Sequence, residues 1–410
     1  MKIKEDKKPL RFHNNLVNAT VDALNYIFND GVYADKAVQT ALKRDARFGA
    51  RDRKFIAETI YDIVRWKRLY NEIAETKNHY NKRNLWKLVA VWAVVNNHKL
   101  PDWKEFAKTP VRRIKGRFKE LQKIRKFKES IPDWLDELGE KELGKSWDAE
   151  INALNQQAQV VLRTNTLKTS PLRLQQLLAK EGIETVLLKN YPDALLLKER
   201  KNVFQTPFFK DGLFEVQDAS SQKVAEFCNV KPGQRVIDAC AGAGGKTLHL
   251  AALMENKGQL IAMDIYGNKL TELKRRAKRN NAHNIQTKVI ESTKTIKKLK
   301  GTADVVLLDS PCSGLGVLKR NPDAKWKLQP EFIDKIKATQ AEIIDRYAQM
   351  VKAGGTLVYA TCSILPSENE EQVKKFLSLH QEFELIDSKT IAAAQSGFDG
   401  FYMAKMKKIN

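Results

Sequence analysis

The stretch "QRVIDACAGAGGKTLHLAALM", residues 234–254, predicts a buried strand, a glycine-rich turn and a helix in direct succession. β-Branched apolar residues form the strand, and the apolar residues after the turn are typical of a buried helix. Between them, Gly242, Gly244 and Gly245 leave backbone N–H groups and the start of the helix open to close approach by a ligand. The stretch therefore predicts an α/β domain with a ligand site at the carboxyl end of its first strand.

Three ligands compete for this turn. A dinucleotide fingerprint would need a glycine at position 247, where the chain has Thr247. A phosphate-binding P-loop would use Gly245, Lys246 and Thr247, but its first glycine is replaced by Cys240, and the strand ending at Asp309 could serve as its Mg²⁺-binding strand. The third candidate is S-adenosylmethionine, which also binds over a glycine-rich first turn.

The next strand, "QLIAMD" at residues 259–264, favours a nucleoside ligand. It ends in Asp264, 26 residues after Asp238 on the first strand, and a carboxylate there accepts hydrogen bonds from ribose hydroxyls. An ATPase P-loop has no need of such a residue. The alternative is that Asp264 caps the helix expected at 267–282.

Two later strands each run into a cysteine. "ADVVLLDSPCSG" at 303–314 places Cys312 after Asp309, and "LVYATCSILPSENEEQ" at 357–372 places Cys362 after a buried strand. Residues 368–371 suit the first turn of the following helix. A lone cysteine is usually a small buried hydrophobe, which is our expectation for Cys228 and for Cys240 in the turn. Two thiols at one sheet edge beside a nucleoside pocket indicate chemistry instead.

Composition points to a nucleic-acid partner. The 410 residues are too many for one ordinary core, and their formal net charge is +23. Such an excess of Lys and Arg suits a polyanion; an anionic membrane is the alternative, but no run of eighteen apolar residues occurs. The charged start lacks an apolar leader segment, and the four cysteines lack the paired spacing of a zinc site. We therefore expect a soluble, cytoplasmic protein without a metal.

Hydrophobic patterning divides the chain into three parts. Residues 1–130 read as helical and close with the basic run "VRRIKGRFKELQKIRKFKES". Residues 131–212 read as a linker and a small α+β module, whose helix would be capped by Ser170 with Pro171 at its first position. From 213 to 410, strands and helices alternate as in a parallel, doubly wound sheet.

The motifs together resemble the RNA cytosine-C5 methyltransferases of the Rsm/NOP/NSUN group. The resemblance spans about 160–410 and is carried by "DACAGAGGKT", "AMD", "LLDSPCSGLGVLKRNPDAKW", "YATCSILPSENEEQV" and "DGFYMAKM". It implies a Rossmann-like S-adenosylmethionine-dependent domain preceded by an RNA-recognition-like module. The stretch "RDRKFIAETIYDIVRW", residues 51–66, is similar to the all-α NusB-like domain of bacterial ribosomal-RNA members, so a ribosomal RNA substrate is expected, with transfer RNA as the alternative.

The resemblance also implies residue roles. Cys362 would attack carbon 6 of the cytosine, Cys312 would assist breakdown of the resulting adduct, and Asp309 would stabilise positive charge at N3. Lys246 would organise Asp309 and the methionine end of the cofactor. The cofactor-binding set implied by the resemblance is Cys240, Ala241, Gly242, Ala243, Gly244, Gly245, Lys246, Asp264, Ser292 and Asp309.

The chain departs from the family pattern in places. Gly242 and Ala243 stand where the family usually has alanine and proline, and no carboxylate is evident near the end of the third strand, where Glu291 or Ser292 would substitute. Two alternatives stay open at this point: an RNA-stimulated P-loop ATPase and a non-catalytic RNA-binding assembly factor. We expect the chain to act on its RNA as a monomer.

Overall fold

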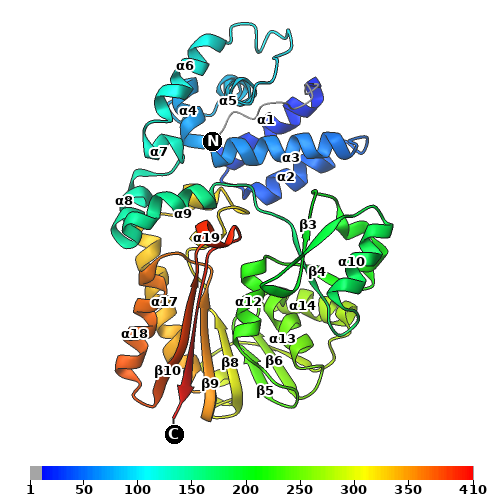
Figure 1. Cartoon of the computed structure of the whole chain (residues 1–410). Coiled ribbons are helices and arrows are strands. Elements are labelled where there is room, and N and C mark those ends of the chain that lie inside the picture. Colours follow the sequence, from blue (N-terminus) through cyan, green and yellow to red (C-terminus); the bar gives the residue numbers. More distant parts are fainter. Residues whose placement is uncertain (1–11, 410) are drawn as a thin grey trace. The chain divides into compact units, whose positions relative to one another are not determined.

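The computed structural model describes residues 12–409, and the chain divides into two compact units (Figure 1). One unit comprises residues 1–155 and 320–328; the other comprises 156–319 and 329–410. Most of the charged start, residues 1–11, on which the expectation of a chain without a leader rests, lies outside the described residues. Between residues 12 and 409, no helix is long and apolar enough to cross a membrane.

The first unit is helical, as the apolar periodicity predicts. Apolar side chains of α1, α3 and α5 line one continuous core, in which Trp86 and Trp92 are buried. The helices of this unit are α1 (Asn14–Phe28), α2 (Ala34–Lys43), α3 (Ala50–Arg65), α4 (Lys67–Ala74), α5 (Lys82–Val95), α6 (Val111–Leu121), α7 (Arg125–Lys128), α8 (Asp133–Leu143), α9 (Trp147–Leu154) and α16 (Ala324–Lys327), with the short 3₁₀ turn η1 (Gly144–Ser146).

The segment 320–328, which the sequence groups with the α/β domain, packs inside the helical unit. Trp326 donates a hydrogen bond to the carbonyl of Val64 at 2.7 Å, so it packs in this unit. Lys325 is fully buried and donates to Asn155 Oδ1 at 2.9 Å, so its ammonium group is not available to an RNA phosphate. Burial lowers the pKa of Lys325 well below its usual range.

Helices α8 and α9 also belong to this unit, although they lie within the region 131–212 that the sequence groups with the α+β module. The physical reason is a set of polar contacts with Arg125 of α7. Its guanidinium donates to Asp136 Oδ1 at 2.8 Å and to Glu140 Oε2 at 2.7 Å, both on α8. The indole of Trp147, at the start of α9, donates to the same Asp136 oxygen at 2.8 Å.

The second unit begins with a small antiparallel sheet of order β2-β3-β1-β4. Helix α10 starts at Pro171, and the Ser170 hydroxyl accepts a hydrogen bond from the N–H of Arg173, so the predicted cap is confirmed. Apolar residues of β1, β3 and α10 form the core of this module. Its elements are β1 (Val161–Thr164), α10 (Pro171–Lys180), β2 (Thr185–Leu188), β3 (Tyr191–Leu197), η2 (Val203–Gln205), α11 (Pro207–Lys210) and β4 (Phe214–Val216).

The larger sheet has the order β10-β11-β9-β8-β5-β6-β7, and β11 alone runs against its neighbours. The expected Rossmann-like α/β fold is therefore confirmed. Its strands are β5 (Arg235–Asp238), β6 (Gln259–Asp264), β7 (Ile285–Val289), β8 (Ala303–Asp309), β9 (Val351–Thr361), β10 (Phe383–Ile391) and β11 (Phe401–Lys408). Its helices are α12 (Ala219–Phe227), α13 (Gly245–Leu253), α14 (Gly267–Asn280), α15 (Thr293–Lys297), α17 (Pro330–Ala348), α18 (Glu370–Leu379) and α19 (Ala393–Ser396), with the turns η3 (Leu315–Val317) and η4 (Pro366–Glu368).

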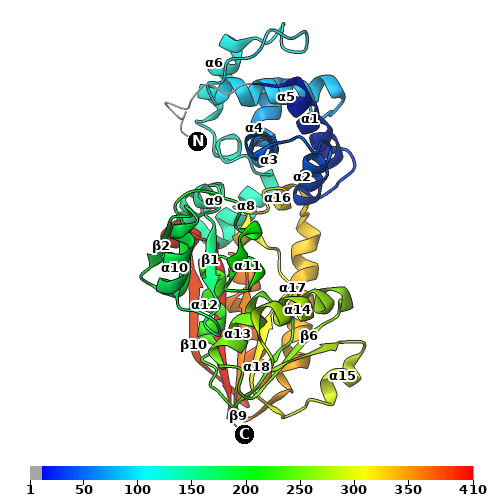
Figure 2. The same ribbon diagram turned by 90° about the vertical axis from the view of Figure 1, so that its right-hand side faces the viewer.

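Alternate residues of each strand enter two apolar layers, as the two-residue repeat of a strand requires. On β8, Val305 and Leu307 join the layer that contains residues of α12, α13 and α14, and Val306 and Leu308 join the layer that contains residues of α17 and α18. Figure 2 shows the short α15 at the edge of the sheet that β7 forms.

Buried polar contacts fix the small module to the larger sheet. Arg163 of β1, 2% exposed, donates to Gln217 and to the carbonyl of Gly245 at the start of α13. On the same helix, His249 is fully buried with its Nε2 3.0 Å from Asp193 Oδ2 of β3. Its Nδ1 has no hydrogen-bond partner among the described residues.

His249 predicts an acid-sensitive contact. Burial lowers its pKa from 6.5 to about 4. Between these two pH values the unfolded chain binds a proton at this residue and the folded chain does not. Stability is therefore fully present above pH 6.5 and falls as the pH drops from 6.5 toward 4, by up to about 1.4 kcal/mol per pH unit. We expect His249→Gln to flatten this part of the pH dependence, measured as hydrogen exchange in β3 and α13.

The control is His283→Gln, which changes an exposed histidine of the same unit. An identical pH dependence of exchange in the wild type and in His249→Gln would contradict the prediction.

Candidate active site

Four strands of the larger sheet carry polar side chains to one edge. Asp238, Asp264 and Asp309 are the last residues of β5, β6 and β8, and Cys362 directly follows β9. Because these strands are parallel neighbours in the order β9-β8-β5-β6, their carboxyl ends meet at the same edge. The structure thus brings together the acids and the thiol that the sequence places at strand ends.

The two thiols are in direct contact. Asp309 of β8 pairs with Ala360 of β9, and the N–H of Ser310 donates to the Ala360 carbonyl at 2.8 Å. Cys312 and Cys362 lie three and two residues beyond this paired position, and their Sγ atoms are 3.3 Å apart.

A close backbone approach fixes the loop that carries Cys312. The N–H of Gly316 donates to the Cys362 carbonyl at 2.9 Å. A Cβ atom at Gly316 would lie 2.7 Å from that oxygen and 2.2 Å from the carbonyl oxygen of Gly400, so the position requires glycine.

Lys246 and Asp309 form an ion pair next to the thiols. Lys246 Nζ lies 2.6 Å from Asp309 Oδ2, and the two side chains are 12% and 28% exposed. Burial lowers the pKa of Lys246, but the charge of Asp309, its hydrogen bond and the nearby Cys362 outweigh burial and raise the pKa overall. Lys246 is therefore an ammonium group paired with Asp309.

The thiols are not equivalent. The contact with Cys362 raises the pKa of Cys312 well above its usual range, and burial and the negative charge of Glu368 add to the rise. Cys312 therefore keeps its proton at neutral pH. Its S–H can donate a hydrogen bond to the Cys362 sulfur across the 3.3 Å contact.

The glycine-rich turn is held by Asp264. Its Oδ2 accepts the N–H of Gly242 and its Oδ1 accepts the N–H of Tyr266, both at 2.8 Å. Gly242 and Gly244 have φ angles of +54° and +88°, which glycine adopts without strain. A Cβ at Gly242 would meet no atom within 4 Å, so the turn is open on that side. Asp264 thus holds the turn, and does not cap α14 as in the alternative interpretation.

The remaining predicted cofactor residues lie on the same turn or at the same edge. Cys240, Ala241 and Ala243 belong to the turn, where the N–H of Ala241 donates to the Met263 carbonyl at 2.9 Å. Ser292 is exposed at the start of α15, three residues beyond β7. Its neighbour Ile290 donates to the Asp264 carbonyl at 2.9 Å, which places this segment beside Asp264.

Glu368 is a residue that the sequence interpretation missed. It is not in the first turn of a helix, because α18 begins at Glu370 and residues 366–368 form the turn η4, which points Glu368 into the core. It is fully buried. Its carboxylate accepts hydrogen bonds from Ser313, Ser363 and Gln340. The available signal was that each of the two strand-end cysteines is followed directly by a serine.

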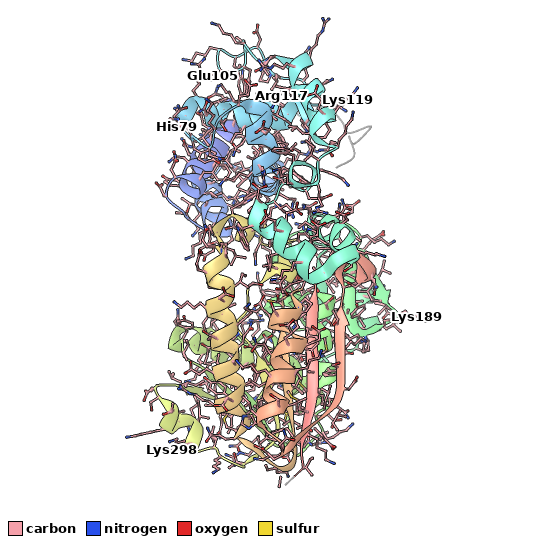
Figure 3. All side chains as sticks on the ribbon, turned by 90° about the vertical axis from the view of Figure 1, so that its left-hand side faces the viewer. His79, Glu105, Arg117, Lys119, Lys189 and Lys298 are labelled. Atoms are coloured by element: carbon pink, nitrogen blue, oxygen red, sulfur yellow. The ribbon has the colours of Figure 1, made fainter. Side chains whose placement is uncertain are left out.

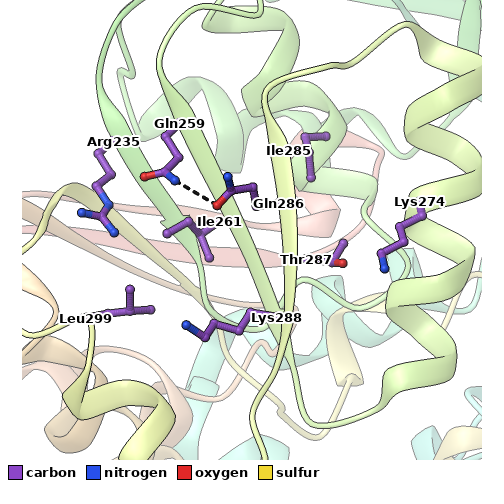
Figure 4. Close-up of a pocket in the computed structure, with 9 residues that line it drawn as sticks. All are labelled: Arg235, Gln259, Ile261, Lys274, Ile285, Gln286, Thr287, Lys288 and Leu299. Carbon is purple, nitrogen blue, oxygen red and sulfur yellow. Dashed lines mark hydrogen bonds between the residues drawn. The ribbon is translucent and has the colours of Figure 1, made fainter.

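A cavity of about 570 Å³ lies elsewhere in this unit (Figure 4). Two of its lining residues, Arg235 and Gln259, are the first residues of β5 and β6, whose last residues lie at the sheet edge that carries Cys312 and Cys362. The cavity is therefore separate from the thiol pair. The full lining is Arg235, Gln259, Ile261, Lys274, Ile285, Gln286, Thr287, Lys288 and Leu299.

Known protein families match this chain. A family model described as "16S rRNA methyltransferase RsmB/F" matches residues 225–407. A second, described as "Methyltr_RsmF/B-like, ferredoxin-like domain", matches residues 131–204.

Individual proteins are similar over most of the chain. A Synechocystis protein named "Probable ribosomal RNA small subunit methyltransferase B" is 38% identical over 300 residues, 68% of this chain and 67% of that protein. "Ribosomal RNA small subunit methyltransferase B" of Pectobacterium carotovorum subsp. carotovorum is 35% identical, and the match covers 68% of this chain and 66% of that protein. The crystal structure of PH0851 matches with a TM-score of 0.84 and 26% identity, covering 98% of this chain and 100% of that one.

Proposed function

Since this chain belongs to the RsmB/F family of 16S rRNA methyltransferases, we propose that it methylates carbon 5 of a cytosine in ribosomal RNA through a covalent adduct with Cys362. S-Adenosylmethionine is the methyl donor of this methyltransferase class. The observation that carries the proposal is the thiol pair: two cysteines with sulfurs 3.3 Å apart, next to the Lys246–Asp309 ion pair.

The turn at the end of β5 fits the expected methyl donor. Asp264 is held by two backbone N–H groups, and each of its oxygens keeps a lone pair for a ribose hydroxyl. The open side of Gly242 leaves room for a ligand against the backbone. The donor supplies an electrophilic methyl group; by the resemblance, Lys246 would hold its methionine end and Asp309 would contact the cytosine.

Carbon 5 of cytosine is too weak a nucleophile to take a methyl group unaided. If the Cys362 sulfur bonds to carbon 6, the ring becomes an enamine and carbon 5 becomes nucleophilic, which divides one difficult step into two easier ones. As the sulfur bonds to carbon 6, the proton that the thiol loses is taken up at N3 of the ring, and Asp309 would accept a hydrogen bond from that protonated nitrogen. The base must leave its stack to enter such a site.

Breakdown of the adduct uses the second thiol. Carbon 5 releases its proton to solvent, the C5–C6 double bond re-forms, and the electrons of the C6–S bond return to the Cys362 sulfur. Cys312, which keeps its proton, donates a hydrogen bond to that departing sulfur. This role is the one that the family resemblance implies, and the contact between the two sulfurs supports it.

The geometry argues against the two alternatives. In a P-loop the backbone N–H groups of the turn face phosphates, whereas here the Gly242 N–H is occupied by the carboxylate of Asp264, which would repel a triphosphate. A non-catalytic assembly factor would not need the thiol contact or the buried ion pair. Both features are present.

The remaining proposals concern the RNA. The excess positive charge suits phosphate contacts, and Figure 3 shows Lys119 of the helical unit and Lys298 of the α/β unit pointing outward. By resemblance, the helical N-terminal region would select the substrate as a NusB-like RNA-binding domain, and the enzyme would act in the cytoplasm as a monomer. Which RNA and which cytosine are modified are questions for the experiment below.

The function is tested by incubating the purified chain with labelled S-adenosylmethionine and 16S rRNA, followed by bisulfite sequencing of the product. We expect methyl incorporation at a cytosine, with RNA binding that weakens steeply as salt rises because several Lys and Arg residues displace counterions together. Transfer RNA and random RNA are the controls for selection. Methylation of another base, or none at all, would contradict the proposal.

The cofactor prediction concerns Asp264. Asp264→Ala removes both the ribose acceptor and the support of the Gly242 turn, so affinity for S-adenosylmethionine should fall by about tenfold or more, since a hydrogen bond to a charged group contributes roughly 1.5–3 kcal/mol. Isothermal calorimetry measures the loss, with Glu255→Ala, an exposed carboxylate just beyond α13, as control. Unchanged affinity, or binding of Mg-ATP alone, would count against the site.

The thiol prediction separates the two cysteines. Cys362→Ala should abolish methyl transfer and leave no covalent complex, because no sulfur adds to carbon 6. Cys312→Ala should form the adduct and methylate it but release it slowly, so an RNA-linked protein band should persist on a denaturing gel. Cys228→Ala, which changes a buried thiol directly after α12, is the control and should behave as wild type. The reverse pattern, with the band in Cys362→Ala, would reverse the two roles.

A further inference from the structure

Glu368 joins the two loops that carry the thiols. Its Oε1 accepts hydrogen bonds from the hydroxyls of Ser313 and Ser363, both at 2.5 Å, and these serines directly follow Cys312 and Cys362. Its Oε2 accepts the N–H of Ser313 at 2.8 Å. One buried carboxylate thus holds the residue after each thiol.

The two serines pass this restraint to the backbone. The N–H of Leu315 donates to Ser313 Oγ at 3.4 Å, and the N–H of Leu365 donates to Ser363 Oγ at 3.1 Å. The two hydroxyl oxygens lie 3.2 Å apart, so the loops touch beneath the thiols. In each Cys-Ser turn, the serine hydroxyl therefore accepts a hydrogen bond from the backbone of its own loop. Glu368 links the two turns.

Gln340 of α17 completes the arrangement from the helix layer. Its Nε2 donates to Glu368 Oε2 and to the carbonyl of Pro311, each at 3.0 Å. Pro311 directly precedes Cys312, so the Cys312 loop is held on both sides of its thiol. Gln340 and Glu368 are fully buried, and Ser363 is 1% exposed.

We propose that Glu368 is the positioning residue that sets the spacing of the two thiols and thereby the release of the methylated base. It does not touch the base. Its hydrogen bonds keep the S–H of Cys312 within reach of the Cys362 sulfur when the C6–S bond breaks and that sulfur takes up the electron pair, while the carbon 5 proton leaves to solvent. The release role rests on the proposed function; the spacing role does not.

The charge of Glu368 supports the same role as its hydrogen bonds. Its negative charge adds to the effects of Cys362 and burial that raise the pKa of Cys312. A protonated Cys312 is what the release step needs. Replacing the carboxylate with an amide of the same size should therefore disturb both the spacing and the protonation of Cys312.

The spacing is tested without RNA. Phenylarsine oxide bonds two thiols at once only when they lie side by side, so the wild type should be captured at Cys312 and Cys362, as mapped by mass spectrometry of the peptides. In Glu368→Gln, the amide NH₂ group would face hydrogen-bond donors where the carboxylate accepts them, so the two loops should separate. The rate of capture by phenylarsine oxide should then fall by about tenfold or more. Glu371→Gln, an exposed residue three positions away, is the matched control and should be captured like the wild type.

Turnover distinguishes positioning from folding. Glu368→Gln should lower kcat by about tenfold or more, the effect of a lost hydrogen bond to a charged group, leave KM for S-adenosylmethionine unchanged, and accumulate the denaturation-resistant RNA adduct. If Glu368→Gln does not fold, Ser313→Ala and Ser363→Ala each remove one arm, and each should slow capture. Wild-type capture and wild-type turnover in Glu368→Gln, or in both serine variants, would overturn the proposal. If the wild type is captured normally but methylates no cytosine, the proposed function is wrong. The comparison of capture rates between the wild type and the variants would still test whether Glu368 sets the spacing of the thiols.

Discussion

The site depends on the parallel pairing of β8 with β9. The register that sets Asp309 against Ala360 carries the chain, within three residues on each strand, to two loops whose thiols meet at 3.3 Å. A shift of one residue would send every side chain of the strand to the opposite face, so the apolar layers on both faces of β8 also fix the thiol contact. The packing of the sheet and the spacing of the two thiols at its edge are therefore set by the same strand register.

A partly buried ion pair and a fully buried carboxylate are held at this edge by different means. Lys246 and Asp309 neutralise each other at 2.6 Å, and Glu368 is surrounded by donors from two loops and a helix. Removing charges from water is costly, and it is tolerated only where partners satisfy them fully. The partners come from strand ends, loops and a helix of the sheet domain, and the contacts of Glu368 hold the two loops that carry Cys312 and Cys362.

Residues that belong to one strand–turn–helix unit could be predicted from the sequence. The family, the Rossmann-like fold, the methyltransferase class and the cap at Ser170 are confirmed, because each rests on local patterns such as the glycine turn or the strand-end cysteines. The sequence places Glu368 at a helix start, whereas its partners include, besides the nearby Ser363, Ser313 at a separation of 55 residues and Gln340 of α17 at a separation of 28. The segment 320–328 packs with the helical unit through Trp326 and Lys325, which no local pattern indicates. The roles of the individual site residues remain proposals.

The most direct measurement identifies the sulfur that bonds to carbon 6. RNA in which the target cytosine carries fluorine at carbon 5 cannot lose a proton there, so the adduct formed with S-adenosylmethionine should persist through digestion. Trypsin separates the two thiols into peptides 301–319 and 353–374, which tandem mass spectrometry resolves. The account predicts the nucleotide on Cys362 in peptide 353–374. A nucleotide on Cys312 in peptide 301–319, or no RNA-linked peptide at all, would contradict it.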